Sequence, residues 1–294
     1  MNTSGFVFVC LLLAVFLPAG SEAQQAKVYR VGLLSGPGKT EERPQTKGFR
    51  AGLREAGYIE DKNLQLNVPE VKTYTDLRVV AKTYVETGSD AIVTQGGTVT
   101  RIARDATKEI PIVFISGVSD PVGEGFVKSL ARPGTNLTGL TNEAGGEIYG
   151  KKLELFKESV PSLRRAVLLY NARGENPGHA KSLTVVREVA SKLGLALSEK
   201  PVKSVGDIDD VLRPAFKQVS EGIFIICSGL FVQRYKEISA FAIQKKLPLW
   251  GCNPDLSPEA LLSYEPDRYR TAFRGAWYVD KILKGAKPAE LPVE

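Results

Sequence analysis

Residues 28–34 read VYRVGLL, an apolar run with the length of a buried β-strand. A polar, Gly-rich turn follows it, and then a helical stretch from about Pro44 to Ala56 that Gly57 ends. The same order of apolar run, turn and helix recurs after residues 91–94 (AIVT), and residues 112–115 (IVFI) are a third apolar run. Strands that are apolar on both faces and alternate with helices are typical of a parallel sheet covered by helices on both sides.

A second block of the same kind begins beyond residue 140, with strand signals at residues 165–170 (RAVLLY) and 223–227 (IFIIC). Two blocks predict an α/β protein with two lobes, each a parallel sheet flanked by helices. The last helical stretch, 269–283, has no strand after it within the second block, so we expect it to return to the first lobe. The expected boundaries are residues 24–140 plus about 265–294 for lobe 1 and 141–264 for lobe 2.

Weaker patterns complete the prediction. Residues 77–85 have helical spacing, and further helices are expected at residues 98–108, 178–193, 207–219 and 231–245. Short strands are expected at residues 63–68, 137–140, near 195, 247–250 and 261–264.

The first 23 residues are predicted to be a signal peptide. Residues 6–17 are apolar, which is too short for the ~20 residues of a membrane-spanning helix, and Pro18 and Gly20 end the run. Ser21 and Ala23 place small residues before a cut after Ala23. The alternative is an uncleaved membrane anchor, because no Lys or Arg precedes the apolar run.

The charge and cysteine content exclude several classes of protein. The whole chain carries +6, and removing residues 1–23, which contain Glu22 and no Lys or Arg, gives +6 − (−1) = +7. The cations are scattered and do not alternate with aromatic residues, so no nucleic-acid partner is expected. Cys10 leaves with the signal peptide. Cys227 and Cys252 end two predicted strands; they could pair in an oxidising compartment, but two buried thiols are the favoured interpretation.

The candidate catalytic and metal-binding residues do not have the spacing that the known motifs require. A Walker phosphate loop needs Gly five residues before the glycine of Gly38-Lys39-Thr40, and Leu33 stands there. His179 is the only His, with no Cys or carboxylate at metal-ligand spacing around it. We therefore expect no cofactor, no metal and no catalytic residues.

In open parallel sheets, ligands bind beyond the carboxyl ends of the strands, so the residues that follow each strand are the candidate contacts. Gly96 and Gly97 allow backbone to approach a ligand, and the helix opened by Thr98 offers free N–H groups to a carboxylate; the alternative is a simple tight turn. The Asp120 carboxylate is expected either to bind a ligand ammonium or to cap a helix that begins at Pro121.

In the second block, Asn171 and Ser228 directly follow strands, and Asn253 lies just beyond Trp250. Such side chains both donate and accept hydrogen bonds, which suits a zwitterion. Trp250 is more readily a core residue than a stacking platform. The expected ligand contacts are Ser35, Gln95, Gly96, Gly97, Thr98, Asp120, Pro121, Thr141, Asn142, Asn171, Ser228 and Asn253.

Several runs resemble the substrate-binding proteins of ABC transporters, a family with a type I periplasmic-binding fold. The most specific are residues 130–140 (LARPGTNLTGL) and 284–294 (KGAKPAELPVE). Residues 49–58 (FRAGLREAGY), 110–114 (IPIVF), 120–122 (DPV) and 150–155 (GKKLEL) also match the family pattern.

The resemblance implies export, two lobes joined by three crossovers, and delivery of a small solute to a membrane permease. Some members look like binders of aromatic amino acids. Members usually continue past the terminal Pro-Val-Glu into a further strand and helix, and the residues after Trp250 depart from the usual family sequence.

These features together predict a periplasmic or otherwise secreted solute-binding protein rather than an enzyme. It is expected to be a monomer that captures a small molecule, an amino acid or related carboxylate, between its lobes and delivers it to an ABC permease. The alternatives are a ligand-sensing module of a receptor or chemoreceptor, and a small hydrolase.

Overall fold

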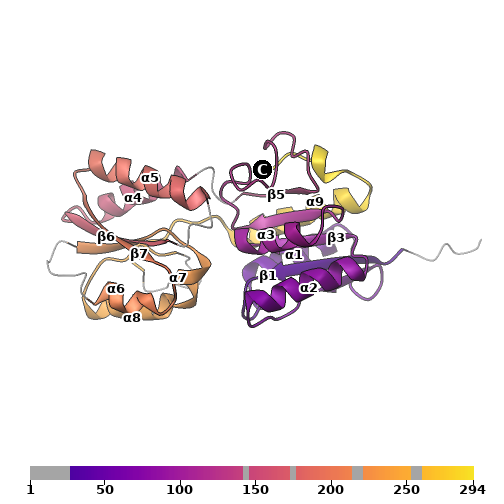
Figure 1. The fold of residues 1–294 in the computed structure, drawn as a ribbon, viewed down its shortest axis with the longest axis horizontal. Helices are drawn as coiled ribbons and strands as arrows, with labels where there is room; N and C mark the ends of the chain where they lie inside the picture. Colours follow the sequence, from indigo (N-terminus) through magenta and orange to yellow (C-terminus); the bar gives the residue numbers. More distant parts are fainter. Residues whose placement is uncertain (1–26, 142–145, 173–176, 214–220, 253–259) are drawn as a thin grey trace, which may run out of the picture.

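The computed structural model describes residues 27–141, 146–172, 177–213, 221–252 and 260–294, without the side chains of residues 177–179. These residues form two bodies, each built on its own parallel sheet (Figure 1). This is the two-sheet α/β architecture that the alternation of apolar strands and helices predicts. The predicted signal peptide lies outside the described residues. Within them, no helix is both long and apolar enough to span a membrane.

The first body contains a five-stranded sheet in which every neighbouring pair is parallel. Its strand order is β2-β1-β3-β4-β5, so the two halves of the sheet run outward from β1 and β3. The strands are β1 (Tyr29–Ser35), β2 (Leu64–Asn67), β3 (Ala91–Gln95), β4 (Ile112–Ser116) and β5 (Leu137–Gly139).

Helices cover both faces of this sheet because alternate strand residues point to opposite sides. Leu33 packs in the cluster beneath α1 (Pro44–Glu55) and α9 (Arg268–Leu283). Leu34 packs in the cluster beneath α2 (Tyr74–Glu86) and α3 (Gly97–Ala106). Both leucines are fully buried, which explains why the strand is an uninterrupted apolar run.

The contact between α1 and α9 depends on glycine and sets the geometry at one end of the first body. A Cβ at Gly48 would lie 2.2 Å from the carbonyl oxygen of Tyr269, and one at Gly52 would lie 2.5 Å from that of Phe273. Only glycine permits this approach of two helix backbones. The two helices therefore run in the same direction with their N-termini side by side.

The second body contains a three-stranded parallel sheet in the order β7-β6-β8, from β6 (Arg165–Asn171), β7 (Ala196–Val202) and β8 (Glu221–Ile225). Helices α4 (Ile148–Ser159) and α5 (Pro177–Lys192) cover one face, and α6 (Asp207–Leu212), α7 (Gly229–Gln233) and α8 (Tyr235–Gln244) cover the other. Trp250 is fully buried and packs against Phe156 and Phe224. It is a core residue, as its position at a strand end favoured.

Four local predictions differ from the structure. The helix expected at residues 231–245 is broken at Arg234, whose φ of −119° separates α7 from α8. The strands expected at 247–250 and 261–264 are reduced to single bridges, Ile223 to Leu249 and Trp250 to Leu262. Of the helix expected at 207–219, α6 ends at Leu212 and residues 214–220 lie outside the described residues.

The fourth difference concerns residues 121–125, which form hydrogen-bonded turns instead of a helix beginning at Pro121. Phe126 and Val127 both donate their N–H groups to the carbonyl of Pro121, which closes the segment into a compact loop. After η1 (Pro288–Glu290), the C-terminal residues lie against β5, where the Thr138 hydroxyl donates to the carbonyl of Leu291 at 2.7 Å.

Candidate functional site

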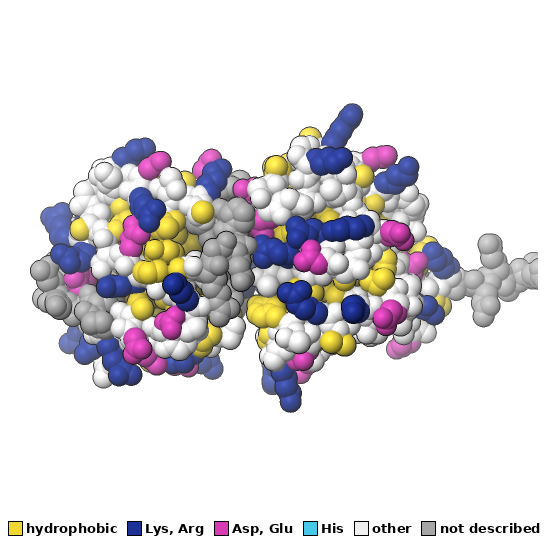
Figure 2. Space-filling model, in the orientation of Figure 1, with side chains coloured by type: hydrophobic (Ala, Val, Ile, Leu, Met, Phe, Trp, Pro, Cys, Tyr) yellow, Lys and Arg dark blue, Asp and Glu magenta, His cyan; other side chains and the backbone are white. Residues whose placement is uncertain are grey.

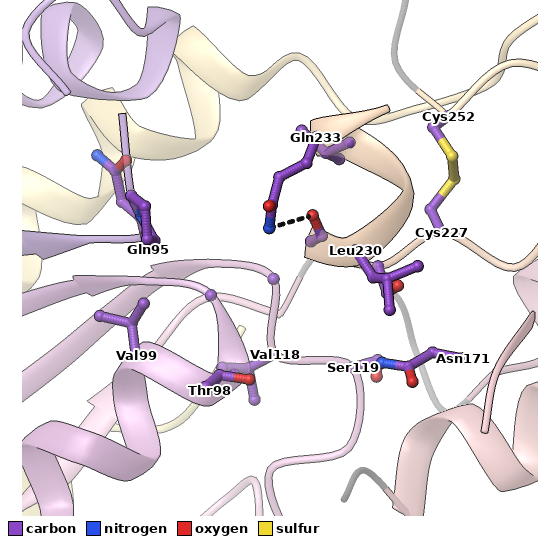
Figure 3. Close-up of a pocket in the computed structure, with 18 of the residues that line it drawn as sticks. Gln95, Thr98, Val99, Val118, Ser119, Asn171, Cys227, Leu230, Gln233 and Cys252 are labelled. Atoms are coloured by element: carbon purple, nitrogen blue, oxygen red, sulfur yellow. Dashed lines mark hydrogen bonds between the residues drawn. A yellow bond between two sulfur atoms is a disulfide. The ribbon is translucent and has the colours of Figure 1, made fainter. Parts of the chain in front are cut away.

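A cavity of about 1060 Å³ lies between the two bodies, at the carboxyl ends of both sheets. Figure 3 shows residues of the first body on one side of it and residues of the second on the other. The first body contributes Gln95, Thr98, Val99, Val118 and Ser119, among others. The second contributes Asn171, Leu230, Gln233 and both cysteines, among others.

The wall formed by the first body rests on a close contact between the loops after β3 and β4. Gly96 has a φ of 113° and donates its N–H to the carbonyl of Ser116, while Gly97 donates to the carbonyl of Gly117, both at 2.8 Å. A Cβ at Gly117, whose φ is 70°, would lie 2.9 Å from the Cα of Gly96. Glycine is thus required for both backbone conformation and packing. The loop pair holds the first turn of α3 at the cavity surface.

Two buried side chains behind this wall hold Gln95 in place. Its Oε1 accepts a hydrogen bond from the Ser35 hydroxyl at 2.9 Å, and its Nε2 donates to the Thr46 hydroxyl at 3.2 Å. All three side chains are buried. Gln95 lines the cavity, whereas Ser35 does not and acts as its support.

The opposite wall is formed by the ends of β6 and β8. Asn171 ends β6, and Ser228 immediately precedes α7. The Ser228 hydroxyl oxygen is buried without a hydrogen-bond partner among the described residues. The Tyr149 hydroxyl accepts the N–H of Cys227 at 3.1 Å and so ties α4 to this wall.

The bodies also approach each other directly across the cavity. Tyr74, at the start of α2, belongs to the first body, and Gly229, at the start of α7, belongs to the second. A Cβ at Gly229 would lie 3.2 Å from the Tyr74 hydroxyl oxygen. Any larger side chain at residue 229 would therefore contact Tyr74 in this arrangement.

Cys227 and Cys252 form a disulfide bond, so the expectation of two free thiols is wrong. The bridge from Ile223 to Leu249 and the hydrogen bond from the Trp250 N–H to the carbonyl of Ile223 hold the segment ending at Cys252 beside β8. That pairing brings the two Cα atoms to 5.5 Å, within the range a disulfide requires. Both cysteines line the cavity.

The sequence-derived contacts divide into three groups. Gln95, Gly96, Gly97, Thr98, Asn171 and Ser228 line the cavity, whereas Ser35, Asp120, Pro121 and Thr141 do not. The Asp120 carboxylate accepts the N–H of Gly123 at 2.8 Å, so it stabilises a turn, and the Thr141 N–H donates to the carbonyl of Glu294 at 2.5 Å. Asn142 and Asn253 lie outside the described residues.

Charged and aromatic lining residues were missed by the strand-end rule. They include Arg43, Tyr74, Arg101, Tyr149, Glu265 and Arg268. Arg43 directly precedes α1, Tyr74 begins α2 and Arg268 begins α9. The signal that would have found them is the start of each helix, since helices that follow parallel strands begin at the edge where ligands bind.

Two buried carboxylates beside the cavity have defined partners. Glu124 has a fully buried side chain that accepts a hydrogen bond from Arg101 at 3.1 Å, while its Oε1 has no partner among the described residues. Burial raises its pKa to about 7 despite the nearby guanidinium. Glu265 pairs with Lys152 at 2.8 Å, with side chains 8% and 1% exposed respectively. This second pair links α4 to the segment that precedes α9.

The geometry is that of a binding cleft between two bodies, and sequence comparison agrees with it. Residues 28–294 match the family model of the ABC transporter substrate binding proteins. The chain belongs to this family. Its fold is accordingly the type I periplasmic-binding fold, and its family consists of proteins that bind small ligands. Within the described residues, no group of three or more His, Cys, Asp or Glu side chains is placed to hold a metal ion.

Individual relatives support the same assignment. The tyrosine-binding protein of Clostridioides difficile is 23% identical over 249 residues, which cover 84% of this chain and 70% of the relative. A Streptococcus pneumonia ABC domain solved with L-Trp is 22% identical with a TM-score of 0.82, covering 91% of this chain and 89% of that one. A conserved domain protein of Vibrio cholerae is 27% identical with a TM-score of 0.79, covering 91% and 88%.

Proposed function

We propose that this protein is exported and captures an amino acid or related small carboxylate between its two bodies, then delivers it to an ABC permease. The observation that carries the proposal is the cavity between the carboxyl ends of the two sheets, because it is lined from both sides. A ligand placed there contacts both bodies at once, so closure of the two bodies buries it. The tyrosine-binding relative and the structure with L-Trp make an amino acid or a similar acid the first class to test.

The proposed lobes are residues 24–140 plus about 265–294 and residues 141–264, moving as rigid units about the segments that join them. The lining provides what a small carboxylate needs. The first turn of α3 offers the N–H group of Thr98, and Asn171 and Ser228 offer side-chain hydrogen bonds from the other side. The apolar part of the ligand would lie against side chains such as Val118 and Leu230.

The proposal is tested by the thermal stability of the mature protein in the presence of amino acids, small carboxylates and sugars. Binding with a Kd in the micromolar range corresponds to about −8 kcal/mol, and ligand at 100 times its Kd stabilises the folded protein by about 2.7 kcal/mol. For a chain of this size that raises Tm by about 5–10 °C. A shift with sugars alone, and with none of the acids, would contradict the proposed ligand class.

The position of the site is tested by filling it. Gly229→Trp would place a large side chain against Tyr74 and prevent closure, so we expect it to abolish the ligand-induced shift. The matched control is Ala240→Trp, an exposed position on α8 that does not line the cavity. Equal ligand shifts in both variants would place the binding site elsewhere.

Export and delivery have separate tests. The mass of the protein recovered from the periplasm or the medium should correspond to removal of residues 1–23, and light scattering should give a monomer. Uptake of the identified ligand by cells that lack the chain should be restored by the wild type and not by Gly229→Trp. Recovery of normal uptake with Gly229→Trp would contradict a role in delivery.

A further inference from the structure

The charges that line the cleft are unbalanced. Among the described lining residues, five are cationic and one is anionic: Lys39, Arg43, Arg78, Arg101 and Arg268 against Glu265. In Figure 2, Lys and Arg side chains lie on the first body beside its border with the second. A site that binds an amino acid needs a carboxylate to bind the ligand ammonium and hydrogen-bond donors to bind the ligand carboxylate. The class of ligand therefore depends on which of these charged side chains already form ion pairs within the protein.

Three of these charges already have partners of opposite sign. Lys39 pairs with Glu42 at 3.0 Å, Arg101 with Glu124 at 3.1 Å, and Glu265 with Lys152 at 2.8 Å. The carboxylate in the cleft is thus engaged by a buried ammonium. Asp120, expected to hold a ligand ammonium, instead accepts the N–H of Gly123 outside the lining. Among the described residues, every carboxylate that lines the cleft already forms an ion pair within the protein.

Arg43, Arg78 and Arg268, by contrast, have no ion-pair partner among the described residues. Arg43 is held in a fixed orientation: it donates to the Ser35 hydroxyl, and to the carbonyls of Gly36 and Pro37 at 2.9 Å each. These bonds use three of the five N–H donors of a guanidinium and neutralise none of its charge. Burial is the main cause of a lowered pKa at Arg43, and the nearby positive charge of Arg268 contributes in the same direction.

The packing of α1 on α9 forces this proximity of two like charges. Arg43 precedes the first residue of α1, and Arg268 is the first residue of α9. The close contacts at Gly48 and Gly52 hold the two helices together. Two guanidinium groups are thus brought to one end of the cleft by rigid elements, and no carboxylate of the described residues pairs with either of them. The positive ends of both helix dipoles add to the same potential.

We propose that Arg43 and Arg268 bind the acidic group of the ligand, and that the ligand is a net anion, an organic acid with an apolar body and no ammonium group. This inference rests on the proposed function and narrows its ligand class. An anion between the two guanidinium groups would replace their mutual repulsion by two charge-assisted interactions. The apolar lining accommodates the rest of the molecule, and a cavity of about 1060 Å³ has room for an aromatic acid.

The test uses ligand pairs that differ only by the α-ammonium group. These are phenylalanine and phenylpropionate, tyrosine and hydroxyphenylpropionate, and tryptophan and indolepropionate, measured by calorimetric titration of the mature protein. We expect the acid without the ammonium to bind at least about 10-fold more tightly than its amino acid in one or more pairs. We also expect that binding to weaken as NaCl is raised from about 0.05 to about 0.5 M, since salt screens the attraction.

The matched variants lie two residues apart on α9. Arg268→Gln should weaken binding of the acid by about 10- to 100-fold, the value of a hydrogen bond to a charged group. Arg270→Gln is the control, because Arg270 is exposed, pairs with Asp267 and does not line the cleft. Arg268→Lys should recover part of the affinity. Melting of the unliganded Arg268→Gln protein at or above the wild-type Tm would show that it folds.

The outcomes separate the two proposals. If amino acids bind as tightly as their partners and Arg268→Gln leaves them unaffected, the anion inference is wrong while the proposed function stands. If no member of any pair binds the wild-type protein, the anion inference is wrong, and the proposed function is wrong as well only if no other amino acid or small carboxylate raises the Tm of the protein. Preferential binding of the acids, lost in Arg268→Gln and kept in Arg270→Gln, supports both.

Discussion

Removal of the Cys227–Cys252 bond should destabilise the second body by about 3.5 kcal/mol. The bond joins residues 25 apart in sequence, and in the chain-entropy model a closed loop of that size lowers the entropy of the unfolded chain by about 12 cal/mol/K. At room temperature this corresponds to about 3.5 kcal/mol of folding free energy. The two cysteines lie at the ends of neighbouring segments of the fold, so little native structure has to change when the bond is absent.

The measurement is urea unfolding of the wild type with and without reductant, alongside a Cys227→Ala, Cys252→Ala double variant. Alanine is preferred to serine because Cys252 is buried, and a hydroxyl there would bury an unpaired polar group. The chain has two Trp residues, so a Trp277→Phe background makes Trp250, in the core of the second body, the only tryptophan reporter. We expect the midpoint to fall by about 1 M or more on reduction.

The double variant provides the control, because reductant should leave its midpoint unchanged. Equal midpoints for the oxidised and reduced wild type would refute the reasoning, since the loop would then contribute nothing to the unfolded-state entropy. Mass spectrometry of the alkylated protein identifies which state is present in each sample.

Three further outcomes are expected. Because the pKa of Glu124 is raised from 4.5 to about 7, its contribution to the free energy of unfolding is largest below pH 4.5 and falls by about 3 kcal/mol as the pH rises through 7; Glu124→Gln should remove this dependence in denaturant titrations from pH 4.5 to 8. Lys152→Met should remove the ion pair of the buried Glu265 carboxylate and cost about 3–5 kcal/mol of stability, whereas a loss under 1 kcal/mol would mean that the pair is solvated. Asp120→Ala should cost about 1 kcal/mol through loss of the bond to Gly123 and leave ligand affinity unchanged; lost affinity in a titration would return Asp120 to the site.

Much of the architecture could be predicted from residue patterns alone. The runs at residues 28–34, 91–94 and 112–115 are apolar at most of the positions that the sheet buries, and they became β1, β3 and β4. Positions of Gly and Pro bounded the helices equally well: α1 begins at Pro44 and is followed by Gly57, whose φ is 90°. Such signals depend only on residues that are neighbours in the sequence, so they can be recognised without knowledge of the fold.

Predictions were less accurate where the outcome depended on distant contacts. The break at Arg234 divides a stretch whose apolar spacing is continuous. The disulfide required the segment before Cys252 to lie beside β8. That position depends on the path of the chain through the fold, which residue composition does not reveal. Asp120 stands in a loop that closes on Pro121, so its carboxylate is used by its own turn.

The sequence by itself determined two sheets, their parallel strands and the edge of each sheet at which the cavity lies, because burial on both faces and the turn residues after each strand are properties of consecutive residues. Which side chains line that cavity was decided by the tertiary structure. Arg43 and Arg268 are 225 residues apart in the chain, and both line the cavity because two helices pack through glycine, which no local sequence pattern indicates. The chemistry of the cleft is therefore a property of the packed helices, and its location is a property of the strands.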